Sequence, residues 1–245
     1  MDTVVLEWEY SPPDYFDSPI KIETQDKCNI EIDNGKAVVK IDSVVFDANP
    51  LMSDALNHVL KARFIGAQLV RHKKFTLSSP AKTIVHPDGC RDYFLQVEPT
   101  RVTVKVTGNQ QIFRDGKVVP DPKLDEISFT LRIHKHPNDK VLAKMLRGYS
   151  DAVDEPDHEL VHLYEIRDAI SKKFSDDKKA RSALKISYDD WSDLGKLCNE
   201  DPLLEGRHHG KHENLHNATN AELSKARKIA KDMIDAYLSY LETSP

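Results

Sequence analysis

The chain has 245 residues, of which 39% are hydrophobic and 31% are charged, and it carries a formal net charge of −5. This composition is typical of a folded globular protein and excludes a disordered or fibrous chain. The charge also argues against a protein that binds nucleic acid through a generally basic surface. The chain has 18 basic and 19 acidic residues up to Pro137, and 17 basic and 21 acidic residues after it.

The sequence gives no indication of a membrane or secretory destination. Its apolar runs fall short of the roughly 20 residues that a bilayer span needs. The opening MDTVVLEWEY has neither the basic nor the apolar region of a signal peptide. The three cysteines, Cys28, Cys90 and Cys198, are too far apart for a C-x-x-C site or a disulfide framework. We therefore expect a cytoplasmic protein in a reducing compartment, with no membrane partner.

Residues 1–137 carry mostly the patterns of β-strands. Residues 30–41 form two β-rich runs around Asn34 and Gly35. This pair favours a type I′ hairpin turn, because both positions tolerate a positive φ. Further strands are predicted from alternation and β-branched content at residues 75–87, 101–108, 110–119 and 126–134.

One segment of this half, residues 51–64 (LMSDALNHVLKARF), has helical spacing instead. A second hairpin is predicted at Asp115 and Gly116. Residues 1–137 are therefore predicted to fold as a β-rich domain, a sandwich or an open barrel with one helix, that senses a ligand or a partner.

From Asn138 onward the pattern changes to that of helices. Pro156 suits a first helical turn, and the apolar residues after it recur with helical period. Thr219 and Glu222 have capping-box spacing, which predicts a long final helix. Shorter helices are predicted at residues 140–149, 177–184 and 189–198. Residues 138–245 are thus predicted to be an α-helical bundle, which makes the chain an α+β protein.

A first candidate for chemistry is HELVH, residues 158–162. On a helix, His158 and His162 would share a face and hold one zinc ion, while Glu159 polarises a bound water. The site needs a third ligand, for which Glu200 is the candidate. Two surface histidines at the start of a helix are the simpler interpretation.

The densest concentration of chemistry lies in residues 205–219, EGRHHGKHENLHNAT. Imidazoles titrate near neutral pH, so beside fixed positive charge they suit proton transfer, phosphate binding or metal capture. Because two cations stand among them and would repel a metal ion, phosphate is favoured and no metal or cofactor is predicted. The residues concerned are Arg207, His208, His209, Lys211, His212 and His216.

The run RHHGKH, residues 207–212, places an arginine and a polar residue ahead of a histidine. Within a helical bundle this pattern resembles the nuclease motif of the HEPN superfamily (higher eukaryotes and prokaryotes nucleotide-binding domains). The motif's arginine corresponds to Arg207, its histidine to His212 and its variable polar position to His208. The resemblance covers the helical half and implies a homodimer whose two motifs meet in a shared cleft.

The resemblance also implies a metal-independent endoribonuclease of a prokaryotic stress or conflict system. Neutral His212 would take the proton of a ribose 2′-hydroxyl, Arg207 would clamp the phosphate, and His208 would support them. Contacts with the substrate are expected from His209, Lys211 and His216.

Whether the helical half is catalytic stays open, because bundles of this superfamily also serve in assembly or nucleotide sensing. The alternatives are a protein that recognises RNA or nucleotides without cleaving them, a non-enzymatic dimeric interaction protein, and the zinc hydrolase based on HELVH.

Overall fold

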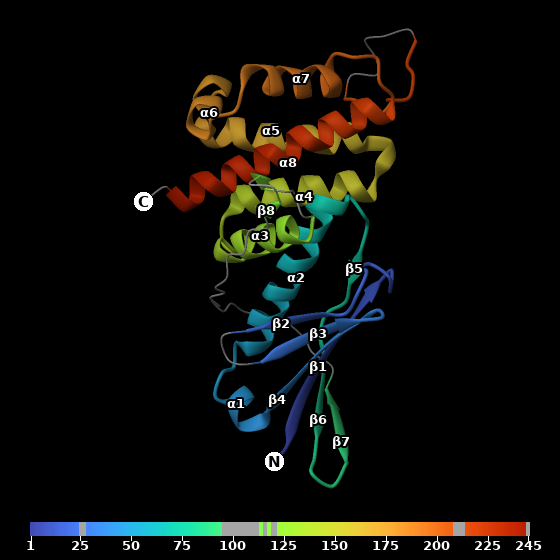
Figure 1. The fold of residues 1–245 in the computed structure, drawn as a ribbon, viewed down its shortest axis with the longest axis vertical. Coiled ribbons are helices and arrows are strands. Elements are labelled where there is room, and N and C mark those ends of the chain that lie inside the picture. Colours follow the sequence, from blue (N-terminus) through green and yellow to red (C-terminus); the bar gives the residue numbers. More distant parts are fainter. Residues whose placement is uncertain (25–27, 95–112, 115–116, 119–121, 208–213, 244–245) are drawn as a thin grey trace. The chain divides into compact units, whose positions relative to one another are not determined.

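The computed structural model describes residues 1–24, 28–94, 113–114, 117–118, 122–207 and 214–243. It divides the chain into two compact units, Met1–Lys135 and His136–Pro245, called here the N-terminal and the C-terminal unit. The first holds an antiparallel sheet and the second is helical, as Figure 1 shows. The predicted α+β class is confirmed.

The N-terminal unit is built on one seven-stranded antiparallel sheet with the central order β2-β3-β4-β1-β6-β7, in which β5 pairs with β1. The Asn34–Gly35 hairpin joins β3 to β4 as predicted, with positive φ values of 43° and 82° at these two residues. The strands are β1 (Thr3–Ser11), β2 (Ile20–Glu23), β3 (Asn29–Asp33), β4 (Lys36–Asp42), β5 (Thr76–Leu77), β6 (Ala81–Val85) and β7 (Arg91–Phe94).

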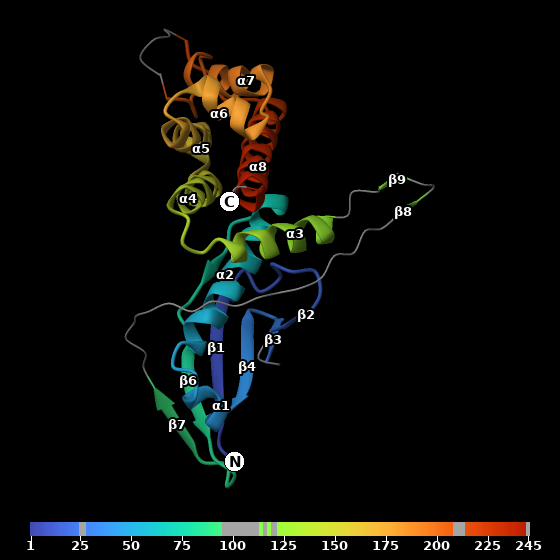
Figure 2. The same cartoon turned by 90° about the vertical axis from the view of Figure 1, so that its left-hand side faces the viewer.

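Helix α2 (Met52–Arg71) covers one face of this sheet and completes its core (Figures 1 and 2). The alternation of β1 turns Leu6 and Trp8 inward, where both are fully buried against α2 residues such as Leu60 and Phe64. The predicted helix at 51–64 is therefore confirmed, and it continues for two further turns. A short helix, α1 (Ser43–Asp47), precedes it and is capped by the Asp42 carboxylate.

The segment predicted as a strand at residues 126–134 is instead part of helix α3 (Pro122–Lys135), so this prediction was wrong. The N-terminal unit also contains more than the single helix predicted. Helix α3 packs against α2 at a close approach, because a Cβ added at Gly66 would lie 2.6 Å from Thr130 Oγ1 and 2.8 Å from the carbonyl oxygen of Glu126.

Two predicted features fall wholly or partly outside the described residues. The strand expected at 101–108 lies outside them, as does the turn at Asp115 and Gly116. On either side of these two residues, β8 (Phe113–Arg114) pairs with β9 (Lys117–Val118).

The C-terminal unit is a bundle of helices, as predicted. The 3-10 helix η1 begins at Pro156 and leads directly into α5, whose Leu160, Leu163, Ile166 and Ile170 are fully buried. None of the helices in the described part of the chain is long and apolar enough to cross a membrane. The elements are α4 (Lys140–Asp154), η1 (Pro156–His158), α5 (Glu159–Phe174), α6 (Asp177–Leu184), α7 (Tyr188–Asn199) and α8 (Asn220–Thr243).

The predicted capping box starts α8. The backbone N–H of Glu222 donates to Thr219 Oγ1 over 3.3 Å, and the Glu222 carboxylate accepts the backbone N–H of Thr219 over 2.7 Å. Along α8 the buried residues Ala226, Ala230 and Met233 form the inward face that their spacing predicts.

Candidate functional site

Arg207 is held at the C-terminal end of α7 by its backbone. Its N–H donates to the carbonyl oxygen of Cys198 over 2.8 Å. The preceding Gly206 permits this approach, because a Cβ at that position would lie 3.1 Å from the oxygen of Leu203 and 3.3 Å from that of Cys198. The Arg207 backbone is thus anchored beside the last turn of α7.

The Arg207 side chain lies across α5. Its guanidinium carbon is 4.8 Å from the centroid of the Tyr164 ring, which is within the range of a cation–π interaction. Its Nη1 is 3.6 Å from an oxygen of Asp168, one turn further along α5, and the side chain is 37% exposed. The guanidinium is therefore positioned by an aromatic face and is not sealed in the core.

A second arginine, Arg167, shares the same aromatic ring. Its guanidinium carbon lies 5.2 Å from the Tyr164 centroid and 4.9 Å from that of Trp191. It also donates to Asp177, which accepts further hydrogen bonds from Ser171 and Trp191. Burial opposes the charge of Asp177, yet these hydrogen bonds hold its pKa below the usual value. Two guanidiniums thus gather around Tyr164.

The other residues of the predicted motif cannot be placed beside Arg207. His208, His209, Lys211 and His212 lie outside the described residues. The chain is described again from Asn214, and the backbone of His216 bonds to Pro202 and Leu204, each over 3.0 Å. The exposed His216 ring has its Nδ1 3.1 Å from the carbonyl oxygen of Asn217.

The HELVH segment does not form the arrangement that a zinc hydrolase needs. The Glu159 carboxylate is 2% exposed and accepts two hydrogen bonds from Arg227 on α8, over 2.5 and 2.6 Å. The His162 ring instead contacts Glu155 at 3.2 Å. Within the described residues, no three potential ligand side chains gather to hold a metal ion, Glu200 included. Glu159 therefore joins two helices and is not placed to activate water.

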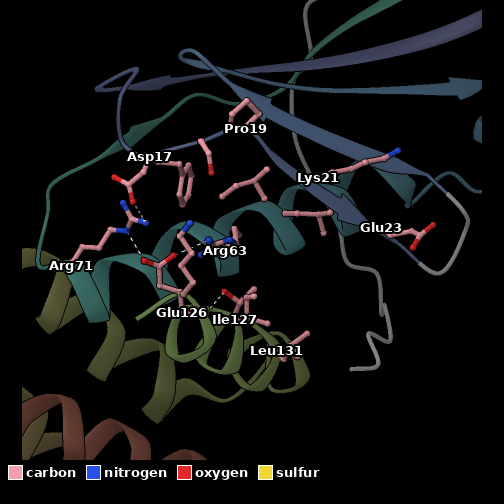
Figure 3. Close-up of a pocket in the computed structure, with 15 residues that line it drawn as sticks. Asp17, Pro19, Lys21, Glu23, Arg63, Arg71, Glu126, Ile127 and Leu131 are labelled. Atoms are coloured by element: carbon pink, nitrogen blue, oxygen red, sulfur yellow. Dashed lines mark hydrogen bonds and ion pairs between the residues drawn. The ribbon is translucent and has the colours of Figure 1, made fainter. Parts of the chain in front are cut away.

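The sequence interpretation missed a pocket of about 390 Å³ in the N-terminal unit, between β2 and α3 (Figure 3). Glu126 of α3, which is 1% exposed, accepts a hydrogen bond from Arg63 over 2.8 Å and from Arg71 over 2.5 Å. Burial acts against the charge on Arg71, but the bonds to Glu126 and Asp17 raise its pKa. Two arginines, the buried Glu126 and the exposed Asp17 thus stand together at one side of the pocket.

One signal in the sequence could have indicated this pocket. Arg63 lies three residues after Leu60 and four before Ala67, so it interrupts the apolar face of the predicted helix at 51–64. An arginine on a buried face requires an anionic partner. The partner could not be found, because Glu126 was assigned to a strand.

Comparisons with known proteins add no further assignment, since no family model, no curated protein and no solved structure matches this chain.

Proposed function

We propose that the C-terminal unit binds RNA through Arg207 and cleaves it without a metal ion, acting as a homodimer. The observation that carries the proposal is the state of the Arg207 guanidinium. It is oriented by Tyr164 and has a long contact of 3.6 Å with Asp168. A partly exposed ion pair of this kind contributes about 1 kcal/mol or less, whereas arginine binds phosphate through two strong parallel hydrogen bonds. Exchanging Asp168 for a phosphate therefore costs little.

A second consideration is the guanidinium of Arg167 beside Arg207. It lies over the same ring and is paired with Asp177 at 2.9 Å, so it does not compete for the ligand. The backbone phosphate of RNA carries a single negative charge, which Arg207 can bind through its fork of donors.

The proposed chemistry is an attack within the RNA strand. His212 removes the proton of a 2′-hydroxyl, whose oxygen then bonds to the adjacent phosphorus. The bond from phosphorus to the next 5′-oxygen breaks, and that oxygen takes a proton from the imidazolium of His208. The products are a 2′,3′-cyclic phosphate and a 5′-hydroxyl end. Arg207 stabilises the negative charge that grows on the phosphate oxygens.

These histidine roles rest on the sequence pattern of residues 207–212 and its resemblance to the HEPN nuclease motif. The dimer belongs to the same proposal, because the resemblance implies that two copies of the motif share one cleft. His209, Lys211 and His216 are assigned to substrate binding on the same basis.

The test is an RNA-cleavage assay in EDTA with the full chain, using a 5′-labelled single-stranded RNA. We expect cleavage that leaves a 2′,3′-cyclic phosphate, and a loss of at least 100-fold for His212→Ala and for Arg207→Ala. Matched controls are His58→Ala and Arg147→Ala, which alter an exposed histidine on α2 and an exposed arginine on α4.

Three results would decide between the possibilities. Cleavage that persists in His212→Ala would show a contaminating nuclease and would refute the proposed base. If the protein binds RNA without cleaving it, and if Arg207→Ala abolishes this binding while Arg147→Ala does not, the proposed recognition of RNA would be supported and the proposed catalysis refuted. Absence of both would favour the non-enzymatic interaction protein, whose oligomeric state sedimentation velocity would establish.

A further inference from the structure

We infer that the pocket of the N-terminal unit binds a small molecule with one carboxylate and an apolar body. The pocket lies between the edge strand β2 and helix α3, and its volume of about 390 Å³ falls in the range of small-molecule sites, about 300–1,000 Å³. Nothing in this inference depends on the proposed ribonuclease, since every residue that it uses belongs to the N-terminal unit.

The first argument is an excess of one positive charge. The cationic side chains lining the pocket are Lys21, Arg63, Arg71 and Lys123, and the anionic ones are Asp17, Glu23 and Glu126. At the buried end, Arg63 and Arg71 share the carboxylate of Glu126, which is 1% exposed, and Arg71 also pairs with Asp17 over 3.2 Å. The excess charge therefore comes from the exposed Lys21 and Lys123, which stand against Glu23 alone within the lining. The lining as a whole favours an anion over a cation.

The second argument is a hydrogen-bond donor left over at the same place. The Arg63 side chain is 9% exposed and uses Nη2 for Glu126 over 2.8 Å. Its Nη1 is buried and has no hydrogen-bond partner among the described residues. Arginine carries its donors in a planar fork that matches the two oxygens of a carboxylate. A ligand carboxylate would therefore satisfy a donor that the protein leaves unpaired.

The rest of the lining suits a hydrocarbon. Ile20 and Ile22 of β2 lie across the pocket from Ile127 and Leu131 of α3, and Phe16 stands beside Arg63 with its ring centroid 4.8 Å from the guanidinium carbon. Figure 3 shows the β2 side and the α3 side facing each other, with the arginines at one end. A ligand with a charged head and an apolar body matches this division.

The size of the charge excess selects the head group. A carboxylate carries one negative charge and neutralises the excess of the lining, whereas a phosphate monoester carries nearly two at neutral pH and would turn the excess into a negative one. A neutral apolar molecule would leave Arg63 Nη1 unpaired. We therefore expect a monoanionic carboxylate to be preferred over both.

The test is isothermal titration calorimetry of the full chain with octanoate, 1-octanol, acetate and octyl phosphate as probes. Octanoate is expected to bind at least tenfold more tightly than each of the other three. Acetate lacks the apolar body and octanol lacks the negative charge. Octyl phosphate carries more negative charge than the lining can neutralise. The inference is overturned if octanoate does not bind, or if octanol or octyl phosphate binds equally well.

Variants then place the binding in the pocket. Ile127→Asp adds a negative charge at a side chain that is 45% exposed, so the fold should tolerate the change. It should weaken octanoate binding at least tenfold. The matched control, Val44→Asp, makes the same kind of change on α1 at a residue that is 63% exposed and lies outside the pocket lining. Equal affinity in the two variants would refute the site.

Arg63→Met tests the head group separately. It should reduce the preference for octanoate over octanol from at least tenfold to about equal, while octanol binding stays unchanged. A preserved preference would exclude Arg63 as the carboxylate ligand. If this variant does not fold, the Ile127→Asp comparison still decides the proposal.

Discussion

Within the described residues, each unit buries one glutamate against arginine, but the two networks differ in how completely they are hydrogen-bonded. In the C-terminal unit, Arg227 donates to both oxygens of Glu159, whose side chain is 2% exposed. In the N-terminal unit, Arg63 and Arg71 share Glu126, which is 1% exposed. The first network joins two helices. The second, in which Arg71 also pairs with Asp17 over 3.2 Å, lies beside a pocket and leaves Arg63 Nη1 without a partner among the described residues.

The difference shows that buried ion pairs in one chain can serve different ends. A buried pair repays its loss of hydration only when the charges match and the hydrogen bonds are complete. The pair of Glu159 and Arg227 meets both conditions and acts as a clamp. The Glu126 network meets the first condition, because Asp17 balances the second arginine, but not the second, because Arg63 retains an unpaired Nη1 within the described residues. An incomplete network beside a cavity is what a binding site requires.

The comparison can be tested unit by unit because each unit contains one of the two tryptophans. Trp8 is buried in the N-terminal unit and Trp191 in the C-terminal unit. Urea unfolding followed by fluorescence in a Trp8→Phe background reports on the C-terminal unit, and a Trp191→Phe background reports on the N-terminal one. Separate readouts matter because two units need not unfold in a single transition.

The largest effect is expected for Arg227→Met. It removes the arginine that donates to both oxygens of the buried Glu159, which should lower the free energy of unfolding of the C-terminal unit by about 3–5 kcal/mol. The Trp191 signal measures this loss. Arg147→Met is the control, because Arg147 is exposed on α4 and its replacement should change stability by about 0.5 kcal/mol or less. Equal losses in the two variants would show that Glu159 and Arg227 are no clamp.

The next effect concerns the helix pair beside the pocket. Gly66→Ala places a Cβ 2.8 Å from the Glu126 carbonyl oxygen and 2.9 Å from the Thr130 nitrogen, both of them backbone atoms that cannot turn aside. Overpacking of this kind should cost the N-terminal unit about 1–3 kcal/mol, read from Trp8.

The matched change in the other unit is Gly195→Ala. Its Cβ would meet the guanidinium tip of Arg167, a flexible group that can move away. A smaller loss is expected there, read from Trp191. If Gly195→Ala lowers the free energy of unfolding as much as Gly66→Ala does, the Arg167 guanidinium cannot move away from the added methyl group as expected.

Arg63→Met should have a smaller effect than Arg227→Met, although both remove an arginine from a buried glutamate. Glu126 keeps Arg71 at 2.5 Å, and the variant also removes a buried donor that has no partner among the described residues. We expect the N-terminal unit to lose about 1 kcal/mol or less, measured by Trp8 fluorescence. A loss as large as that for Arg227→Met would make Arg63 a structural residue and would weaken the case for a ligand.

The features predicted correctly from the sequence are those set by neighbours in the chain. The Asn34–Gly35 turn needs two adjacent residues that tolerate positive φ, and the structure has φ values of 43° and 82° there. The capping box of Thr219 and Glu222 likewise joins residues three positions apart. Such signals do not depend on the rest of the fold, so a single sequence reveals them.

Helix α3 was missed because its buried face contains a charged residue. The alternation of Ile127, Phe129 and Ile133 with polar residues suggested a strand. In the structure the buried residues include Glu126, Phe129 and Ile133, which follow helical spacing, whereas Ile127 is 45% exposed. Counting glutamate as a surface residue concealed this face. Its burial depends on two arginines of another helix, which a local pattern does not contain.

The surroundings of Arg207 could not be predicted for a similar reason. The motif pointed to Arg207 itself, but Tyr164 precedes it by 43 positions and meets it through the packing of the bundle. The aromatic contact and the partly exposed ion pair to Asp168 appear only in the folded chain.

The smallest predicted effect is a pH response of opposite sign in the two units. In the N-terminal unit, hydrogen bonds to Asp92 and Asp2 raise the pKa of His86. These contacts therefore stabilise the fold fully at a pH below about 6.5, the pKa of histidine in the unfolded chain. Their contribution is lost as the pH rises through the pKa of His86 in the folded protein. Asp177 in the C-terminal unit has a lowered pKa, so its contacts stabilise the fold above about pH 3.9 and are lost as the pH falls through the folded pKa.

Raising the pH from about 6 to about 8 should therefore increase amide hydrogen exchange of β7, after correction for its intrinsic pH dependence, and leave Trp191 fluorescence unchanged. Lowering it from about 5 to about 2 should change Trp191 fluorescence, because the indole donates to Asp177 over 3.0 Å. His86→Gln should abolish the first response and preserve the second. An NMR titration midpoint for His86 at or below about 6.5 would contradict the assignment, because the two aspartates would then not favour the charged imidazole.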